Sequence, residues 1–284
     1  MNRPKIKSTL FRMLEDAGKV LKAAILKPKA IHKKGELDLV TATDKKCEKI
    51  IVRAIQRNFP SHAILTEESP PMGNSDCRWI VDPLDGTCNF AHSFPVASVS
   101  IAYEEAGKIQ MGGVLDPFRG ELFFAERGKG ASLNGKKIHV SSTPLLNDAL
   151  VCTGFPYNRR DHMEDYIGVF KTFLMRVQDL RRVGSAALDL CYVAAGRFDG
   201  YWEFHLQPWD KAAAMLIVEE AGGRLSNFSG DPLTLTDTQN LASNGKLHAE
   251  MLALAKPFRH VAKNNLNGID FSTRMNSASV RFKK

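Results

Sequence analysis

The chain has 284 residues and a formal net charge of +8, and its 44% hydrophobic and 25% charged residues are ordinary for a globular protein. It contains no stretch of about 18 apolar residues, and its N-terminus, MNRPKIKSTLF, lacks the apolar core of a signal peptide, so we expect a soluble, cytoplasmic protein without a membrane contact. Five cysteines without a C-x-x-C pair predict reduced thiols rather than disulfides or a zinc site.

The positive charge is concentrated at the two ends of the chain. Residues 1–34 hold ten Lys and Arg against two acids, and residues 256–284 hold seven against one, so the region between them is net acidic. Such ends could contact RNA or an acidic partner protein. Solvated ends are the simpler interpretation, because terminal charge is often merely exposed.

Apolar periodicity predicts the elements of the first half of the chain. Helical spacing indicates amphipathic helices over about residues 8–26 and 44–58. A strand is expected at 63–66, and three more should form a meander, at 97–103, 109–115 and 121–125. Asn134 and Gly135 indicate a hairpin turn after the meander. This half is therefore expected to contain a β-meander, with the two helices flanking the active region.

Helical patterns return in the second half, around a strand at 198–204. They cover about residues 160–176, 185–196, 209–222 and 245–255. Alternating groups of strands and helices predict a mixed, layered α/β structure. Because Ser, Thr and Pro interrupt the pattern near 141–144, we expect halves at 1–145 and 146–257, followed by a basic, flexible tail at 258–284.

The segment WIVDPLDGTCNF, residues 79–90, is the most informative part of the sequence. Its apolar start predicts a buried strand that stops at Asp82, because Pro83 cannot donate a ladder hydrogen bond. A turn there brings Asp85 back towards Asp82 and leaves the Leu84 carbonyl free as a third oxygen donor. Carboxylate and carbonyl oxygens in such a cluster suit Mg²⁺.

A short helix is predicted to open at Gly86 and Thr87. The N–H groups at the start of a helix lack internal partners and lie at the positive end of its dipole, so they can bind a phosphate beside the metals. An Asp-Gly turn with an Asp helix cap is the simpler alternative, and it is common in soluble proteins.

Three further acidic positions could join Asp82 and Asp85. Glu67, beside Glu68, follows a predicted strand end, and Asp210 begins a predicted helix. Carboxylates at strand ends and helix starts converge at the rim of an α/β sheet. Each has an alternative. Glu68 could be an exposed charge, Asp210 could serve only the helix dipole, and Asp44 in Thr-Ala-Thr-Asp resembles a capping box.

Five segments in this order resemble the inositol monophosphatase family, over about residues 8–255. They are LVTATD (39–44), TEES (66–69), DPLDGT (82–87), GSAALD (184–189) and WDKAA (209–213). Ordered motifs are far more specific than any one of them. The stretch RVGSAALDL (182–190) further resembles the bacterial extragenic-suppressor branch of the family.

The resemblance implies a five-layered αβαβα sandwich and a role for each matching residue. One Mg²⁺ would be held by Glu67, Asp82 and the Leu84 carbonyl, and a second by Asp82, Asp85 and Asp210. Glu67, Thr87 and Asp44 would take part in catalysis, with Thr87 and Asp44 orienting a water. Substrate contacts would come from Asp85, Gly86, Thr87, Ala186, Glu203 and Asp210.

The chain departs from the family pattern at two positions. Cys88 replaces a usual second Thr, and Ala214 replaces a common Gly. We expect Cys88 to leave the Thr87 hydroxyl in place, and the Ala214 methyl to shift Asp210 only slightly.

The resemblance implies a Mg²⁺-dependent phosphatase that acts on inositol 1-phosphate, a small phosphorylated polyol, as a homodimer. Fructose 1,6-bisphosphate and 3′-phosphoadenosine 5′-phosphate are alternative substrates. A different class also stays open: the extragenic-suppressor branch is associated with RNA polymerase and ribosomal RNA transcription. The chain could therefore work mainly through a protein or RNA partner.

Overall fold

The computed structural model describes residues 2–27, 31–33, 39–157, 159–160 and 162–261. Its helices are α1 (Arg3–Ala24), α2 (Ala42–Asn58), α3 (Thr87–Ala91), α4 (Met163–Leu174), α5 (Ala186–Ala194), α6 (Pro208–Glu220) and α7 (His248–Ala255), with 3₁₀ turns η1 (Leu146–Asp148) and η2 (Lys256–Phe258). Most of the basic tail predicted at 258–284 lies outside the described residues.

The strands form two large sheets and one two-stranded ribbon. The ribbon pairs β1 (Ile31–Lys33) with β2 (Leu39–Thr41). The seven-stranded sheet holds β3 (Ala63–Thr66), β4 (Cys77–Asp85), β5 (Ser98–Glu105), β6 (Lys108–Asp116), β7 (Glu121–Glu126), β8 (Ala131–Leu133) and β9 (Lys136–Lys137), in that order. The five-stranded sheet contains β10 (Leu150–Thr153), β11 (Asp179–Arg181), β12 (Gly200–Phe204), β13 (Arg224–Ser226) and β14 (Gln239–Ser243), in the order β11-β10-β12-β14-β13.

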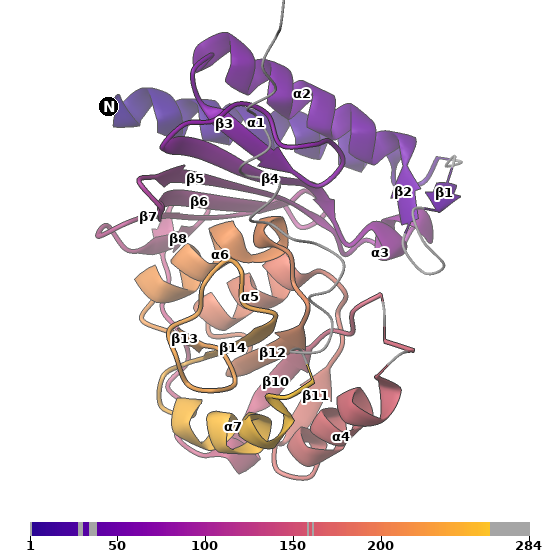
Figure 1. The fold of residues 1–284 in the computed structure, drawn as a ribbon, viewed down its shortest axis with the longest axis vertical. Coiled ribbons are helices and arrows are strands. Elements are labelled where there is room, and N and C mark those ends of the chain that lie inside the picture. Colours follow the sequence, from indigo (N-terminus) through magenta and orange to yellow (C-terminus); the bar gives the residue numbers. More distant parts are fainter. Residues whose placement is uncertain (1, 28–30, 34–38, 158, 161, 262–284) are drawn as a thin grey trace, which may run out of the picture.

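Helices and sheets alternate in five layers (Figure 1). Helices α1 and α2 cover the outer face of the seven-stranded sheet, α5 and α6 fill the space between the sheets, and α4 and α7 cover the five-stranded sheet. The predicted mixed α/β fold with an αβαβα arrangement is confirmed. The proposed division into halves stays a prediction, and α6, from the second half, packs directly on β6 of the first.

The outer helices form where apolar residues recur at helical spacing. On α1 the fully buried Leu10, Leu14 and Leu21 face the sheet. This helix begins five residues before the predicted start, because Asn2 caps it and Pro4 occupies its first turn, where a missing N–H costs nothing. The predicted meander is confirmed as β5, β6 and β7, and the predicted hairpin turn joins β8 to β9.

The prediction that the sheet stops at Asp82 is wrong. Strand β4 continues to Asp85, which pairs with Ser98 after a shift in register between Asp82 and Asp85. Pro83 therefore sits in the irregular part of the strand, where a missing N–H is tolerated. The irregularity turns the two carboxylates towards the interior between the sheets.

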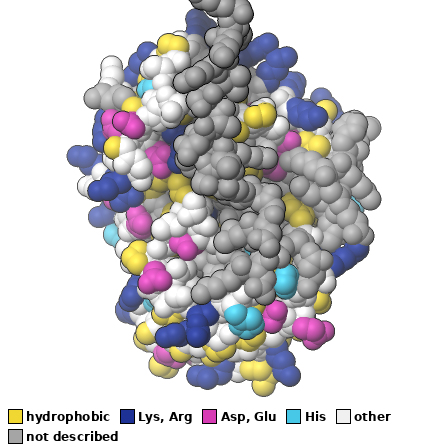
Figure 2. Space-filling view, viewed as in Figure 1, with side chains coloured by type: hydrophobic (Ala, Val, Ile, Leu, Met, Phe, Trp, Pro, Cys, Tyr) yellow, Lys and Arg dark blue, Asp and Glu magenta, His cyan; other side chains and the backbone are white. Residues whose placement is uncertain are grey.

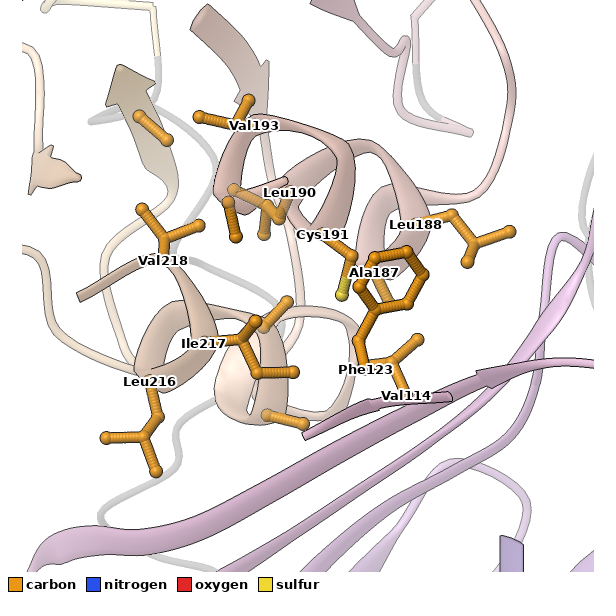
Figure 3. Packing of buried hydrophobic residues seen from close by; sticks show 14 of the residues in the cluster. Val114, Phe123, Ala187, Leu188, Leu190, Cys191, Val193, Leu216, Ile217 and Val218 are labelled. Carbon is orange, nitrogen blue, oxygen red and sulfur yellow. The ribbon is translucent and has the colours of Figure 1, made fainter. Parts of the chain in front are cut away.

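The middle layer packs against the first sheet through small and branched side chains. Figure 3 shows Cys191 of α5 and Ile217 of α6 beside Val114 of β6 and Phe123 of β7. All four are fully buried, as are Ala212, Ala213 and Ala214 in the second turn of α6. This close packing fixes the start of α6, which carries Asp210, against the strands that lead to Asp82 and Asp85.

No helix in the described part of the chain is long and apolar enough to cross a membrane. On the face shown in Figure 2, the Lys and Arg side chains drawn in colour are spread among Asp and Glu rather than gathered in one patch. That distribution is typical of a solvated surface.

Candidate active site

A cavity of about 560 Å³ opens between the two sheets, where β4, α3, α5, β12 and α6 meet. Every predicted site residue except Asp44 lines it. A smaller hollow of about 380 Å³ between α1 and α2 is lined by Lys, Thr and aliphatic side chains and has no carboxylate. The predicted chemistry therefore belongs to the larger cavity.

Asp82 is placed by a local turn. Its Oδ1 accepts the Leu84 N–H at 2.9 Å, and the side chain is only 2% exposed. This turn is the one expected from Asp-Pro-Leu-Asp. The Leu84 carbonyl, which we expected to be free, accepts the Thr87 hydroxyl at 3.0 Å. A carbonyl oxygen has two lone pairs, so this bond leaves one for a metal.

Asp85 is held by the loop that begins α5. Its Oδ2 accepts the Ser185 hydroxyl at 2.5 Å and the Ala187 N–H at 2.8 Å. Ser185 is the N-cap residue of α5, so the carboxylate lies at the positive end of that helix. These bonds join β4 to a segment 100 residues further along the chain.

Asp210 caps its own helix and also lines the cavity. At the third position of α6, its Oδ2 accepts the Gln207 N–H at 2.7 Å in a capping box. Asp210 thus lies in the first turn of α6, as the helix-dipole interpretation expects, and it also caps the helix. The bond from the Gln207 N–H uses one carboxylate oxygen and leaves the other able to serve as a metal ligand in the cavity.

The loop that carries Glu67 is anchored by Glu48 of α2. The buried Glu48 carboxylate accepts the Thr66 hydroxyl at 2.7 Å and the Glu68 N–H at 2.9 Å, and it also accepts the Ser69 hydroxyl. Glu48 was not among the predicted site residues. A usable signal was present, since Glu48 falls on the apolar face of its helix, where an unpartnered carboxylate would be costly.

The carboxylates raise one another's pKa values. Burial, then the charges of Glu67, Asp85 and Asp210, raise the pKa of Asp82 well above its usual range. Burial, and then the charges of Asp85 and Glu67, also raise the pKa of Asp210 well above its usual range. Burial raises the pKa of Asp85. Buried like charges of this kind favour either protons or a cation.

The donor set fits Mg²⁺, which takes carboxylate and carbonyl oxygens. Among the residues that the structure describes, no three His, Cys, Asp or Glu side chains are already arranged to enclose a metal ion. Hydrogen bonds occupy one oxygen each of Asp82, Asp85 and Asp210. The ligand roles of Glu67, Asp82, Leu84, Asp85 and Asp210 therefore remain proposals.

Thr87 and Asp44 lie together although 43 residues separate them. The Thr87 Oγ1 is 3.1 Å from Asp44 Oδ1, while Asp44 Oδ2 accepts the Thr41 N–H at 2.9 Å in a capping box at the start of α2. The expected capping box and the expected pairing with Thr87 are thus both present. Asp44 is fully buried behind Thr87, so it would act on the cavity only through that hydroxyl.

Helix α3 starts at the floor of the cavity. Gly86, its N-cap, has a φ of 91°, and no side chain caps the helix. Only glycine adopts this conformation easily. The N–H groups that open α3 can therefore face an anion in the cavity.

The far side of the cavity holds Ala186 and Glu203. Glu203, on β12, is 8% exposed, and its carboxylate accepts the Tyr201 hydroxyl. Burial raises the pKa of Glu203 to about 7. Both residues line the cavity, as expected for contacts with the alcohol part of a substrate.

The two departures from the family pattern are placed differently. Cys88 is exposed and lines the cavity beside Thr87, whereas Ala214 is buried in α6. The Thr87 hydroxyl keeps its partners despite Cys88. Asp210 likewise keeps its capping position.

The comparisons with known proteins agree with this architecture. The model of the inositol monophosphatase family matches residues 3–259. An inositol-1-monophosphatase from Synechocystis is 47% identical over 229 residues, covering 79% of this chain and 79% of that protein. Nus factor SuhB from Pseudomonas aeruginosa is 42% identical over 234 residues, covering 80% of this chain and 86% of the relative.

A solved structure gives the same result. The extragenic suppressor protein suhB from Bartonella henselae superposes with a TM-score of 0.85 at 38% identity, covering 88% of this chain and 98% of that one. The similar proteins thus include both an inositol phosphatase and a Nus factor. On the family match and these identities, the chain belongs to the inositol monophosphatase family.

Proposed function

We propose that this protein is a Mg²⁺-dependent phosphomonoesterase that hydrolyses inositol 1-phosphate or a closely similar phosphorylated polyol. The observation that carries the proposal is the convergence of Glu67, Asp82, Asp85 and Asp210 with the start of α3 in one cavity. Carboxylates opposite a helix N-terminus can hold cations against a phosphate. Similarity to an inositol-1-monophosphatase supports the same substrate class.

Two Mg²⁺ ions bound by the carboxylates and the Leu84 carbonyl would stabilise the charge of the transferring phosphoryl group and lower the pKa of water. The protein's own residues hold the carboxylates proposed to bind metal in place. Hydrogen bonds hold Asp82 to the Leu84 N–H, Asp85 to Ser185, and Asp210 to the Gln207 N–H. These bonds orient the ligands before a cation arrives, which reduces the reorganisation needed for catalysis.

The Thr87 hydroxyl is the group proposed to orient the attacking water. Its position is set from behind by Asp44 and from the side by the Leu84 carbonyl. If the hydroxyl donates to one of these oxygens, its lone pairs can accept from a water in the cavity. The N–H groups of Gly86 and Thr87 would hold the phosphate in line with that water.

A substrate panel tests the proposal. We expect purified protein with Mg²⁺ to release phosphate from inositol 1-phosphate faster than from fructose 1,6-bisphosphate or 3′-phosphoadenosine 5′-phosphate, and chelation of Mg²⁺ to abolish release. Asp210→Asn should lower kcat/KM by about 100-fold or more. Absence of Mg²⁺-dependent hydrolysis of every small phosphomonoester would refute the function.

A regulatory role is the second candidate, supported by similarity to Nus factor SuhB. The protein would then contact RNA polymerase or RNA, with catalysis secondary. Full rescue of a cell that lacks the protein by inactive Asp82→Asn protein would favour this role, whereas rescue that requires phosphatase activity would favour the enzyme. We also propose a homodimer, which sedimentation of the purified protein would test.

A further inference from the structure

Two further carboxylates, Asp189 and Glu203, line the cavity beside those proposed to bind metal, and we call this pair the acidic wall. Asp189, in the first turn of α5, is 1% exposed and lines the cavity. Among the described residues, no hydrogen bond of ordinary geometry reaches either of its carboxylate oxygens. The neighbouring Cys152 thiol, a weak donor, lies close enough to lower the pKa of Asp189. Leaving a buried acceptor unpaired is costly, because water no longer supplies its hydrogen bonds. Such an acceptor beside a substrate cavity is explained if the substrate supplies the donor.

Glu203 forms the other half of this wall. The charge of Glu203 contributes, after burial, to raising the pKa of Asp189, so the two carboxylates are electrostatically coupled. Arg182 is the basic side chain that counteracts them, and its charge lowers the pKa of both groups. Arg182 is itself exposed at the cavity rim, which leaves the buried part of the wall with acceptors and few donors.

We propose that Asp189 is a specificity-determining residue that accepts hydrogen bonds from hydroxyl groups of the alcohol part of the substrate, beside Glu203. The inference rests on the proposed phosphatase function and names the feature of the substrate that the site selects. A polyol carries several O–H donors and pairs the Asp189 oxygens on binding. An aryl or simple alkyl ester leaves them unpaired, and a site built for hydrogen bonds discriminates strongly against such analogues.

Gly154 allows the position of Glu203, the second residue of the wall, to be tested separately from Asp189. A Cβ built on Gly154 would lie 2.1 Å from Glu203 Oε2 and 2.3 Å from its carboxyl carbon, too close for any contact. The Glu203 carboxylate can therefore occupy its place only because residue 154 has no side chain. Gly154→Ala should displace that carboxylate without touching Asp189 or the carboxylates proposed to bind metal.

The experiment compares two esters in each variant, with Mg²⁺ present. Asp189→Asn keeps the size of the side chain but removes its charge and one acceptor. We expect its kcat/KM to fall at least tenfold more for inositol 1-phosphate than for para-nitrophenyl phosphate, mainly through KM. Gly154→Ala should show the same selectivity. Asp148→Asn, at an exposed aspartate, is the matched control and should leave both values and the melting temperature at wild-type levels.

Three results would contradict the proposed role of Asp189 in substrate specificity. Equal losses for the two esters would show a merely structural role, and unchanged kinetics would show none. A larger loss for phosphoethanolamine than for inositol 1-phosphate would assign the wall to an ammonium group instead of hydroxyls. If Asp189→Asn does not fold, Asp189→Ser is measured in its place, and equal losses for both esters in that variant overturn the inference. Wild-type protein that hydrolyses neither ester contradicts the proposed function itself.

Discussion

The hydroxyl of Thr87 at the start of α3 lies 3.1 Å from the Asp44 carboxylate at the start of α2. Asp44 is fully buried and also caps its own helix through Thr41. The Asp44 carboxylate therefore stabilises the N-terminus of α2 with one oxygen and positions the Thr87 hydroxyl with the other. The pairing links a stability role to the proposed chemistry, and the two can be separated by mutation.

Replacing Thr87 with Val should lower kcat for phosphomonoester hydrolysis by roughly 100-fold, within the range lost with a positioned proton-transfer group. Thr87→Ser keeps the hydroxyl and should stay within about tenfold of wild type. Melting temperatures measured alongside show whether the fold is intact. Equal losses in the two variants would mean that the hydroxyl has no role.

Removing the Asp82 carboxylate should stabilise the protein in the absence of Mg²⁺ and weaken its response to Mg²⁺. Its pKa is raised by burial and by neighbouring carboxylates, so ionised Asp82 opposes folding at neutral pH. Bound Mg²⁺ should stabilise the wild type by about 2.7 kcal/mol at 100 times its Kd. We expect Asp82→Asn to melt higher in chelator and to lose most of the Mg²⁺-induced shift. Glu15→Gln, at an exposed position, should behave as wild type in both conditions.

His248 should make the protein less stable in mild acid. Its ring lies between the Ser243 and Ser226 hydroxyls, at 3.0 Å and 2.9 Å, and burial lowers its pKa from 6.5 to about 4. Between these values the unfolded chain binds a proton that the folded protein does not, so stability is present above 6.5 and falls as the pH drops towards 4.

Urea unfolding measures this contribution. Between pH 7.5 and pH 5 the loss attributable to His248 should be roughly 2 kcal/mol. His248→Asn should flatten the pH dependence by that amount, whereas His92→Asn, at an exposed histidine, should leave it as in the wild type. An unchanged slope in His248→Asn would refute the assignment.

Adjacent glycines on β6 should differ in their tolerance of a methyl group. A Cβ on Gly112 would lie 2.5 Å from the Ala213 carbonyl oxygen and 2.9 Å from its Cα, where α6 packs on the sheet. On Gly113 it would meet only methyl ends of Leu10 and Leu14, at 2.7 Å. Overpacking against backbone should cost Gly112→Ala roughly 3 kcal/mol or more, and Gly113→Ala about 1 kcal/mol.

Unfolding in denaturant compares the two glycine variants. Because α6 carries Asp210, Gly112→Ala should also reduce Mg²⁺ binding, whereas Gly113→Ala should not. A larger cost for Gly113→Ala would mean that α1 is packed more rigidly against the sheet than α6.

Local patterns in the sequence were sufficient for the helices and for the strands of the meander, but not for most strands of the second sheet. The periodicity around Leu10 and Leu14 predicted α1, and Asn134–Gly135 predicted the hairpin turn. The strand end at Asp82 was misjudged, because a ladder can continue past a proline at an irregularity. Local reasoning about Pro83 could not include the pairing of Asp85 with Ser98.

Some features of the candidate site could likewise be predicted from the sequence, and others could not. Asp82, Asp85 and the turn between them follow from neighbouring residues, because a proline and a glycine constrain the backbone there. Glu48 under the Glu67 loop, Ser185 on Asp85, and the unpaired Asp189 depend on contacts between distant segments. The hydrogen-bond partners of a buried carboxylate are determined only when helices and sheets pack, because packing brings distant segments together and excludes water. The sequence by itself determined the family and the acidic turn, and the fold decided which polar groups face the substrate.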